Sequence, residues 1–120
     1  MKYKIYIVLF SFIFSSEYAE RYYSAMDKGI KMFESSETEG EFLETSNYFY
    51  RISQVVKDDW LSSYYYAYSN TSLSMMQDDP DIKELYLDKA FDIISPFDTL
   101  QISNIDSTAM SEIHTLKAMI

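Results

Sequence analysis

Glycine and proline are almost absent from this chain, which has two of each among its 120 residues. Folds built from strands need a turn every few residues, and glycine and proline are among the residues that most often make those turns. Their scarcity favours long helices. Because 48% of the residues are hydrophobic and 18% are aromatic, the sequence predicts a packed core rather than a disordered chain. We therefore predict an all-α fold, with one domain at most at this length.

The N-terminus has the layout of a secretory signal peptide. Two lysines precede an almost uninterrupted apolar run over residues 5–14, and small residues follow it. This order is typical of signal peptides, and the run is shorter than the roughly 20 residues that a stable membrane span needs. We predict that residues 1–19 are a signal peptide, cut between Ser16 and Ala19, that the protein is exported (periplasmic or secreted), and that no stable membrane span remains. An uncleaved anchor or a buried N-terminal helix is the alternative.

The remaining residues, 20–120, show apolar side chains at helical spacing. In the first of these segments, Tyr22, Met26, Ile30 and Phe33 fall on one face. Gly29 interrupts that segment at a cost of about 1 kcal/mol relative to alanine, which indicates either the close approach of a neighbouring helix or chance. The predicted helices cover residues 20–34, 39–56, 60–76, 80–95 and 110–120, with an irregular stretch over 97–107.

Polar residues mark the starts of these helices. Hydroxyl and carboxylate side chains accept hydrogen bonds from the free amides of a first helical turn. A proline is harmless at the first helical position, where its missing amide would have no partner. The predicted caps are Thr38 with Glu41, Asp58 or Asp59 before Trp60, and Asp79 before Pro80.

Two blocks match a helix-hairpin repeat pattern. The first has small, aromatic and small residues at Ser46, Tyr50 and Ser53, followed by Asp-Asp-Trp-Leu-Ser-Ser-Tyr-Tyr-Tyr-Ala over 58–67; the second has Ala90 and Pro96. In these residues the chain, from about position 25 onward, resembles the tetratricopeptide-repeat-like (TPR-like) proteins exported by bacteria. It departs from the pattern where serines replace alanines, where Asp58 replaces a helix-ending proline, and where Ala90 follows Ser53 by 37 residues instead of roughly 34.

The resemblance implies antiparallel helix hairpins stacked as a short right-handed solenoid. Residues 20–120 would form this repeat domain, with its last repeat incomplete because the chain is an N-terminal fragment. The resemblance also implies a role in protein binding, and it brings no catalytic residues.

The chain offers little for catalysis or metal binding. It has no cysteine, so disulfides, thiolate metal sites and cysteine nucleophiles are excluded. We expect the single histidine, His114, to be an ordinary surface or helix-end residue, and the acidic residues 78–81 to cap a helix, since they lack the spacing and glycine of a calcium loop. We predict no enzyme activity, no cofactor and no metal; a buried acidic pair in a deep pocket would instead favour a hydrolase.

Aromatic residues near the middle of the chain are the candidates for partner binding. Pure core packing does not need so many tyrosines in a row, and aromatic residues are favoured at interfaces, although packing in the hairpin core is the simpler interpretation for Trp60 and Tyr64. The candidates are Trp60, Tyr64, Tyr65, Tyr66 and Tyr68.

The net charge of −9 argues against nucleic acid or anionic lipid as the partner. We predict a protein or peptide partner, with the acidic side chains selecting basic ones. The alternative is self-association through residues 108–120, where an apolar helical stripe continues up to Ile120.

Overall fold

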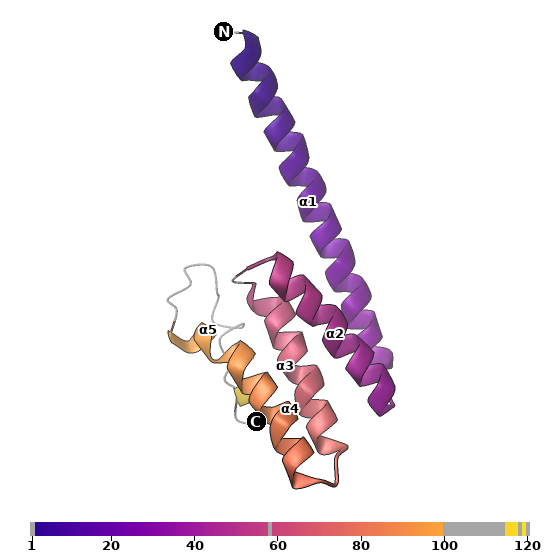
Figure 1. Ribbon diagram of the computed structural model, residues 1–120. Coiled ribbons are helices and arrows are strands. Elements are labelled where there is room, and N and C mark those ends of the chain that lie inside the picture. Colours follow the sequence, from indigo (N-terminus) through magenta and orange to yellow (C-terminus); the bar gives the residue numbers. More distant parts are fainter. Residues whose placement is uncertain (1, 58, 100–114, 118, 120) are drawn as a thin grey trace.

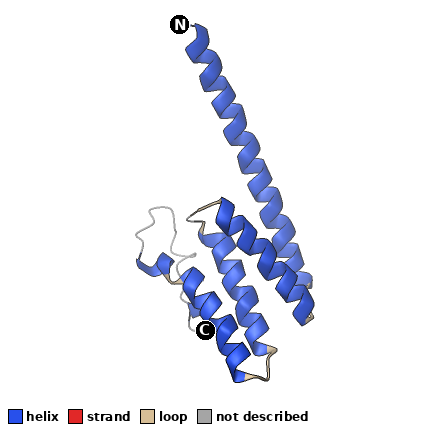
Figure 2. Cartoon of the chain, viewed as in Figure 1, coloured by secondary structure: helices blue, strands red, loops and turns tan. Residues whose placement is uncertain are grey.

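The computed structural model describes residues 2–57, 59–99, 115–117 and 119, and every element in that part of the chain is a helix (Figures 1 and 2). The elements are α1 (Lys2–Ser35), α2 (Glu39–Val55), α3 (Trp60–Met75), α4 (Pro80–Ile94) and α5 (Pro96–Thr99). No strand occurs among the described residues, so the predicted all-α class is confirmed for them.

Consecutive long helices run in opposite directions and pack side by side, with α3 at the centre (Figure 1). Helix α2 lies on one side of α3 and α4 on the other, while the C-terminal half of α1 lies mainly against α2. The N-terminal half of α1 extends beyond the other helices, so the longest axis of the molecule measures 66 Å. The short connections between the helices make this antiparallel arrangement the natural one.

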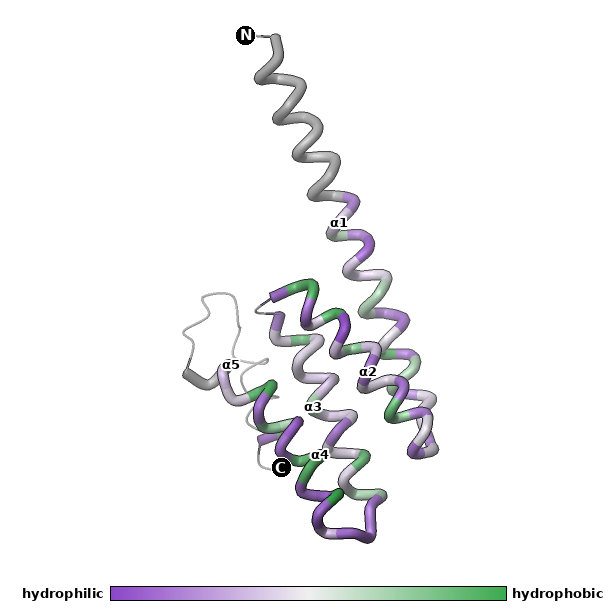
Figure 3. The backbone as a smooth tube through the Cα atoms, in the orientation of Figure 1, coloured by the Kyte–Doolittle hydropathy of each residue, from purple (hydrophilic) through white to green (hydrophobic). Residues whose placement is uncertain are grey.

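Three of the long helices begin at predicted caps. The Thr38 hydroxyl accepts from the amide of Glu41 at 3.2 Å, and Asp79 accepts from the amide of Asp81 at 2.9 Å, with Pro80 in the first turn of α4. At α3 the cap is Asp59, which accepts from the amide of Ser62 at 3.2 Å. Each such cap contributes about 1 kcal/mol. The turn that precedes α4 is the hydrophilic, purple band at the lower end of the bundle in Figure 3.

Two predicted boundaries differ from the structure. The first helix begins at Lys2 instead of residue 20, because no glycine or proline precedes Gly29; the cleavage between Ser16 and Ala19 stays a prediction. Residues 97–99, predicted to be irregular, belong to the helical turn α5. Phe97 is 5% exposed, and burying its ring against the core favours this turn. Residues 100–107 lie outside the described part of the chain.

The largest group of buried apolar side chains joins α3, α4, α5 and residue 116. Trp60, Tyr64, Tyr68 and Ile93 pack around it, half-buried. It contains Ala67, Ala90, Ile94, Phe97 and Leu116.

The burial of Leu116 bears on the self-association hypothesis. Its side chain is 1% exposed and packs within its own chain, so it does not contribute to a free apolar stripe. Met119 is 42% exposed, and the other residues of the segment 108–120, apart from 115 and 117, lie outside the described part. Self-association there stays a prediction.

Gly29 lies at a point of close approach between α1 and α2. A Cβ atom added to Gly29 would lie 2.7 Å from ring atoms of Phe49 and 2.9 Å from the ring of Tyr48. Phe49 is fully buried and its ring stacks on that of Tyr65, with centroids 5.1 Å apart. The close approach expected at this glycine is confirmed.

A polar contact joins α2 to α3. Ser46 is buried and its hydroxyl accepts from the side-chain amide of Asn70 at 3.0 Å. The second amide hydrogen of Asn70 goes to the carbonyl of Tyr66 at 2.9 Å. Ser46 thus gives α2 both the small size predicted for close packing and a hydrogen-bond acceptor.

None of the helices in the described part of the chain combines the length and the apolar character that crossing a membrane requires.

Candidate functional site

Most of the aromatic residues predicted to bind a partner touch one another on α3. Trp60, Tyr64 and Tyr68 lie on the side that packs against the core formed with α4. Tyr65 stacks on Phe49 of α2 and also meets the ring of Tyr64 edge-on, with centroids 5.3 Å apart. Tyr66 lies beside Tyr50 on α2, with ring centroids 5.2 Å apart. All the predicted aromatics are half-buried.

These aromatic rings make many of their contacts with other residues of the same chain. The ring of Phe33 from α1 meets Tyr68 edge-on at 4.8 Å and Tyr65 at 5.5 Å, so these tyrosines bind α1 to α3. Burial raises the pKa of Tyr66, with a further contribution from neighbouring Tyr50. The structure therefore brings Trp60, Tyr64, Tyr65 and Tyr68 together in one aromatic cluster and leaves Tyr66 apart from it, beside Tyr50. Their role in partner binding stays a prediction.

The acidic residues 78–81 act as predicted in the structure: Asp79 caps α4. Among the described residues, no group of three or more His, Cys, Asp or Glu side chains is placed to hold a metal ion. His114 lies outside those residues.

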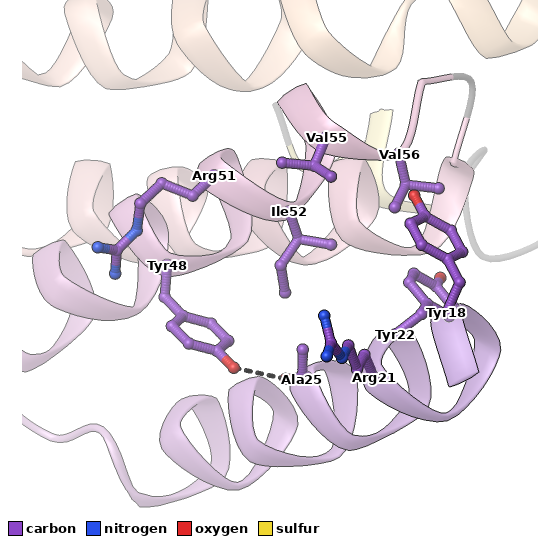
Figure 4. Close-up of a pocket in the computed structure, with 9 residues that line it drawn as sticks. All are labelled: Tyr18, Arg21, Tyr22, Ala25, Tyr48, Arg51, Ile52, Val55 and Val56. Atoms are coloured by element: carbon purple, nitrogen blue, oxygen red, sulfur yellow. Dashed lines mark hydrogen bonds between the residues drawn. The ribbon is translucent and has the colours of Figure 1, made fainter. Parts of the chain in front are cut away.

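A cleft opens between α1 and α2 on the described surface (Figure 4). The two helices meet at the turn over residues 36–38 and separate toward the C-terminal end of α2. The cleft lies in the wide part and has a volume of about 410 Å³, within the usual range of ligand pockets.

Apolar side chains and tyrosine rings line most of this cleft. Ala25 from α1 and Ile52, Val55 and Val56 from the end of α2 form the apolar part. Val55 is 71% exposed, an unusual degree for a valine beside other apolar groups. Tyr18, Tyr22 and Tyr48 complete the lining together with Arg21 and Arg51.

Two hydrogen bonds hold the tyrosine walls in place. Tyr48 donates its hydroxyl hydrogen to the carbonyl oxygen of Ala25 at 2.8 Å, which joins α2 to α1 across the cleft (Figure 4). Tyr22 donates to Oδ2 of Asp59 at 2.7 Å, which ties α1 to the cap of α3. These two bonds fix the positions of both rings in the lining of the cleft.

Burial and neighbouring charges shift the pKa values of the hydroxyls of Tyr22 and Tyr48. Burial, and then the hydrogen bond and negative charge of Asp59, raise the pKa of Tyr22 well above its ordinary value. Burial also raises the pKa of Tyr48, while the nearby Arg51 opposes that rise. Both groups are therefore neutral hydrogen-bond donors at physiological pH, and neither has the lowered pKa of an activated nucleophile or base.

Positive charge collects around Tyr48. The ammonium of Lys28 lies 5.7 Å and the guanidinium of Arg51 lies 5.9 Å from the centroid of its ring, the distance of a cation–π contact. Arg21 stands across the cleft on α1 and forms an exposed ion pair with Glu17 at 3.5 Å.

Sequence reasoning missed this cleft. Arg21 and Arg51 are the only arginines in the chain, and each lies one position from an apolar helical face. That pattern could have indicated a positively charged site beside apolar residues. The separation of α1 from α2, which opens the cleft, depends on tertiary packing and could not be predicted.

Comparison with protein families, with curated proteins and with solved structures finds no match for this chain. The fold and the cleft define it as an all-helical protein whose neighbouring helices pack together and leave an apolar hollow between the first two.

Proposed function

We propose that this protein is an exported, non-enzymatic helical-repeat scaffold of the TPR-like kind, which binds a protein or peptide partner. In this proposal α1 with α2 and α3 with α4 form successive hairpins of a short right-handed stack. The antiparallel packing of neighbouring helices supports the hairpins, and the Ser46, Tyr50 and Ser53 pattern supports the repeat.

The observation that carries the binding role is the cleft between α1 and α2. It presents a half-open apolar surface with tyrosine rings and few free polar groups. Exposed apolar surface of this kind marks sites of interaction, and tyrosine supplies contact area at a low cost in side-chain entropy. No carboxylate lines the cleft, which gives a hydrolase no support there.

Selection from a displayed library of random peptides tests the binding role. The full chain is the target, and Val55→Gln is the counter-target, since it makes an exposed part of the cleft polar. Leu85→Gln is the matched control, because Leu85 is 53% exposed and lies on α4.

We expect peptides that bind the full chain and the Leu85→Gln variant saturably and bind the Val55→Gln variant several-fold more weakly. If no peptide is enriched, or if the enriched peptides bind all three proteins equally, the cleft is not a binding site.

Export is tested by expressing the full chain in a Gram-negative host and measuring its mass in each cell fraction. The proposal predicts a periplasmic product that begins between residues 17 and 20. A full-length product confined to the cytoplasm would refute export.

A further inference from the structure

The cleft between α1 and α2 carries a charge opposite to that of the chain as a whole. The net charge of the chain is −9, yet Arg21 and Arg51, its only arginines, line the cleft and no carboxylate does. Lys28 adds a third cation beside Tyr48. An apolar surface bordered by guanidinium groups suits an apolar ligand with a negative charge at its edge.

The two guanidinium groups stand on opposite walls of the cleft. Figure 4 shows Arg21 rising from α1 beside Ala25, and Arg51 extending from α2 to the outer side of Tyr48, with Ile52 between the two arginines. An extended segment that covers Ile52 can therefore place a carboxylate near either wall. Guanidinium groups hold carboxylates through paired hydrogen bonds.

Both arginines are available to such a ligand. Among the described residues Arg51 forms no ion pair, and its guanidinium rests over the ring of Tyr48. The pair of Arg21 with Glu17 is long, at 3.5 Å, and the two side chains are 79% and 59% exposed. Exposed pairs of this kind are weak, so a ligand carboxylate can share or replace Glu17.

Distant acidic residues do not cancel this local attraction. Charges separated by more than about 8 Å are largely screened at physiological ionic strength, whereas the arginines touch the ligand directly. Three acids lie close to the cleft. Asp59 is bound by the hydroxyl of Tyr22 and by the amide of Ser62. Glu17 and Glu20 line an adjoining hollow, and Glu17 already faces Arg21.

We propose that the occupant of the cleft is a peptide segment whose apolar side chains cover Ile52 and Val55 and whose flanking carboxylates bind Arg21 and Arg51. This deepens the proposed function and rests on it. The net charge of the chain suggested a basic partner, whereas this proposal predicts an acidic one. The charge of the residues that line the cleft, and not the net charge, determines which ligand binds there.

Three labelled peptides test the proposal by fluorescence anisotropy with the full chain. All share the apolar centre Leu-Phe-Ile-Leu, which is flanked on both sides by Asp-Glu, by Asn-Gln or by Lys-Lys. We expect the acidic peptide to bind about tenfold more tightly than the neutral one. Two partly exposed ion pairs supply about the binding free energy that a tenfold change requires. The basic peptide should bind most weakly.

The variants Arg51→Gln and Arg21→Gln should each weaken binding of the acidic peptide about threefold to fivefold. Their effect on the neutral peptide should be clearly smaller, and Arg51→Lys should restore part of the loss. Lys83→Gln, on the exposed face of α4, removes the same charge far from the cleft and should change nothing. Circular dichroism of each variant checks that it is folded.

The outcomes separate the two claims. Equal affinity for the acidic and neutral peptides, with weaker binding by Val55→Gln, would overturn the anionic preference and keep the cleft as a binding site. An acidic preference that both arginine variants retain would also overturn it. If none of the three peptides binds, the proposed occupant is refuted, while the binding role is decided by the selection from the peptide library.

Discussion

At the scale of single residues, Asp59 joins two parts of the molecule through one atom. Its Oδ2 accepts from the amide of Ser62 in α3 and from the hydroxyl of Tyr22 in α1. The cap could be predicted, because an aspartate before an apolar helical pattern is a local signal. The contact with Tyr22, 37 positions away, could not, since it depends on how α1 packs.

The pKa of Tyr22 gives this contact a pH dependence. A folded-state pKa raised above the ordinary 10.0 means that the unfolded chain loses its proton first. The stabilising contribution is therefore complete below pH 10 and is lost as the pH rises toward the folded pKa. We predict that the free energy of unfolding begins to fall near pH 10 and keeps falling as the pH rises toward the folded pKa.

Tyr22→Phe removes the bond to Asp59 and should lower the free energy of unfolding at neutral pH by about 1 kcal/mol. It should also make the alkaline fall shallower, with a residual slope from Tyr48 and Tyr66. Tyr86→Phe is the control, since Tyr86 lies on α4 and not beside Tyr22. Urea unfolding at several pH values measures both effects, and an equally steep fall in Tyr22→Phe would refute the assignment.

At the scale of helices, the starts are better predicted than the packing. Thr38, Asp59 and Asp79 define where α2, α3 and α4 begin, because caps act within a few residues. The sequence did not predict the short helix α5, because the burial of Phe97, and not a local sequence pattern, stabilises it. That burial requires Ala90, Ile94 and Leu116 to be in place, which no local pattern reveals.

Gly29 tests the contact between α1 and α2. In Gly29→Ala the new methyl group would overlap the Phe49 ring, which is fully buried and cannot move freely. Overpacking typically costs about 1–3 kcal/mol, and a fully buried ring places Gly29→Ala in the upper part of that range. Helix propensity returns about 1 kcal/mol, so we predict a net loss of about 1–2 kcal/mol by urea unfolding.

Gly40→Ala is the matched control, because a Cβ there meets nothing within 4 Å and α2 gains helix propensity. It should leave stability unchanged or raise it by up to about 1 kcal/mol. A Gly29→Ala variant as stable as the parent chain would show that α1 and α2 are not in close contact at this point.

At the scale of the whole molecule, the charge of the surface and that of the cleft differ in sign. Composition predicted an acidic protein that selects basic partners. The packing of α1 on α2 places Arg21 and Arg51 on one hollow, and places most of the predicted aromatic surface of α3 inside the bundle. The all-α class could be predicted from glycine and proline content, but the location of the cleft needed the arrangement of the helices.

The most direct test of the account is methyl NMR of the full chain, titrated with the acid-flanked peptide. The account predicts shifts for the methyl groups of Ala25, Ile52, Val55 and Val56, which line the cleft. The exposed methyl groups of Ile82 and Leu85 on α4 should stay unchanged. The largest shifts at Ile82 and Leu85, or no shift at the cleft at saturating peptide, would contradict it.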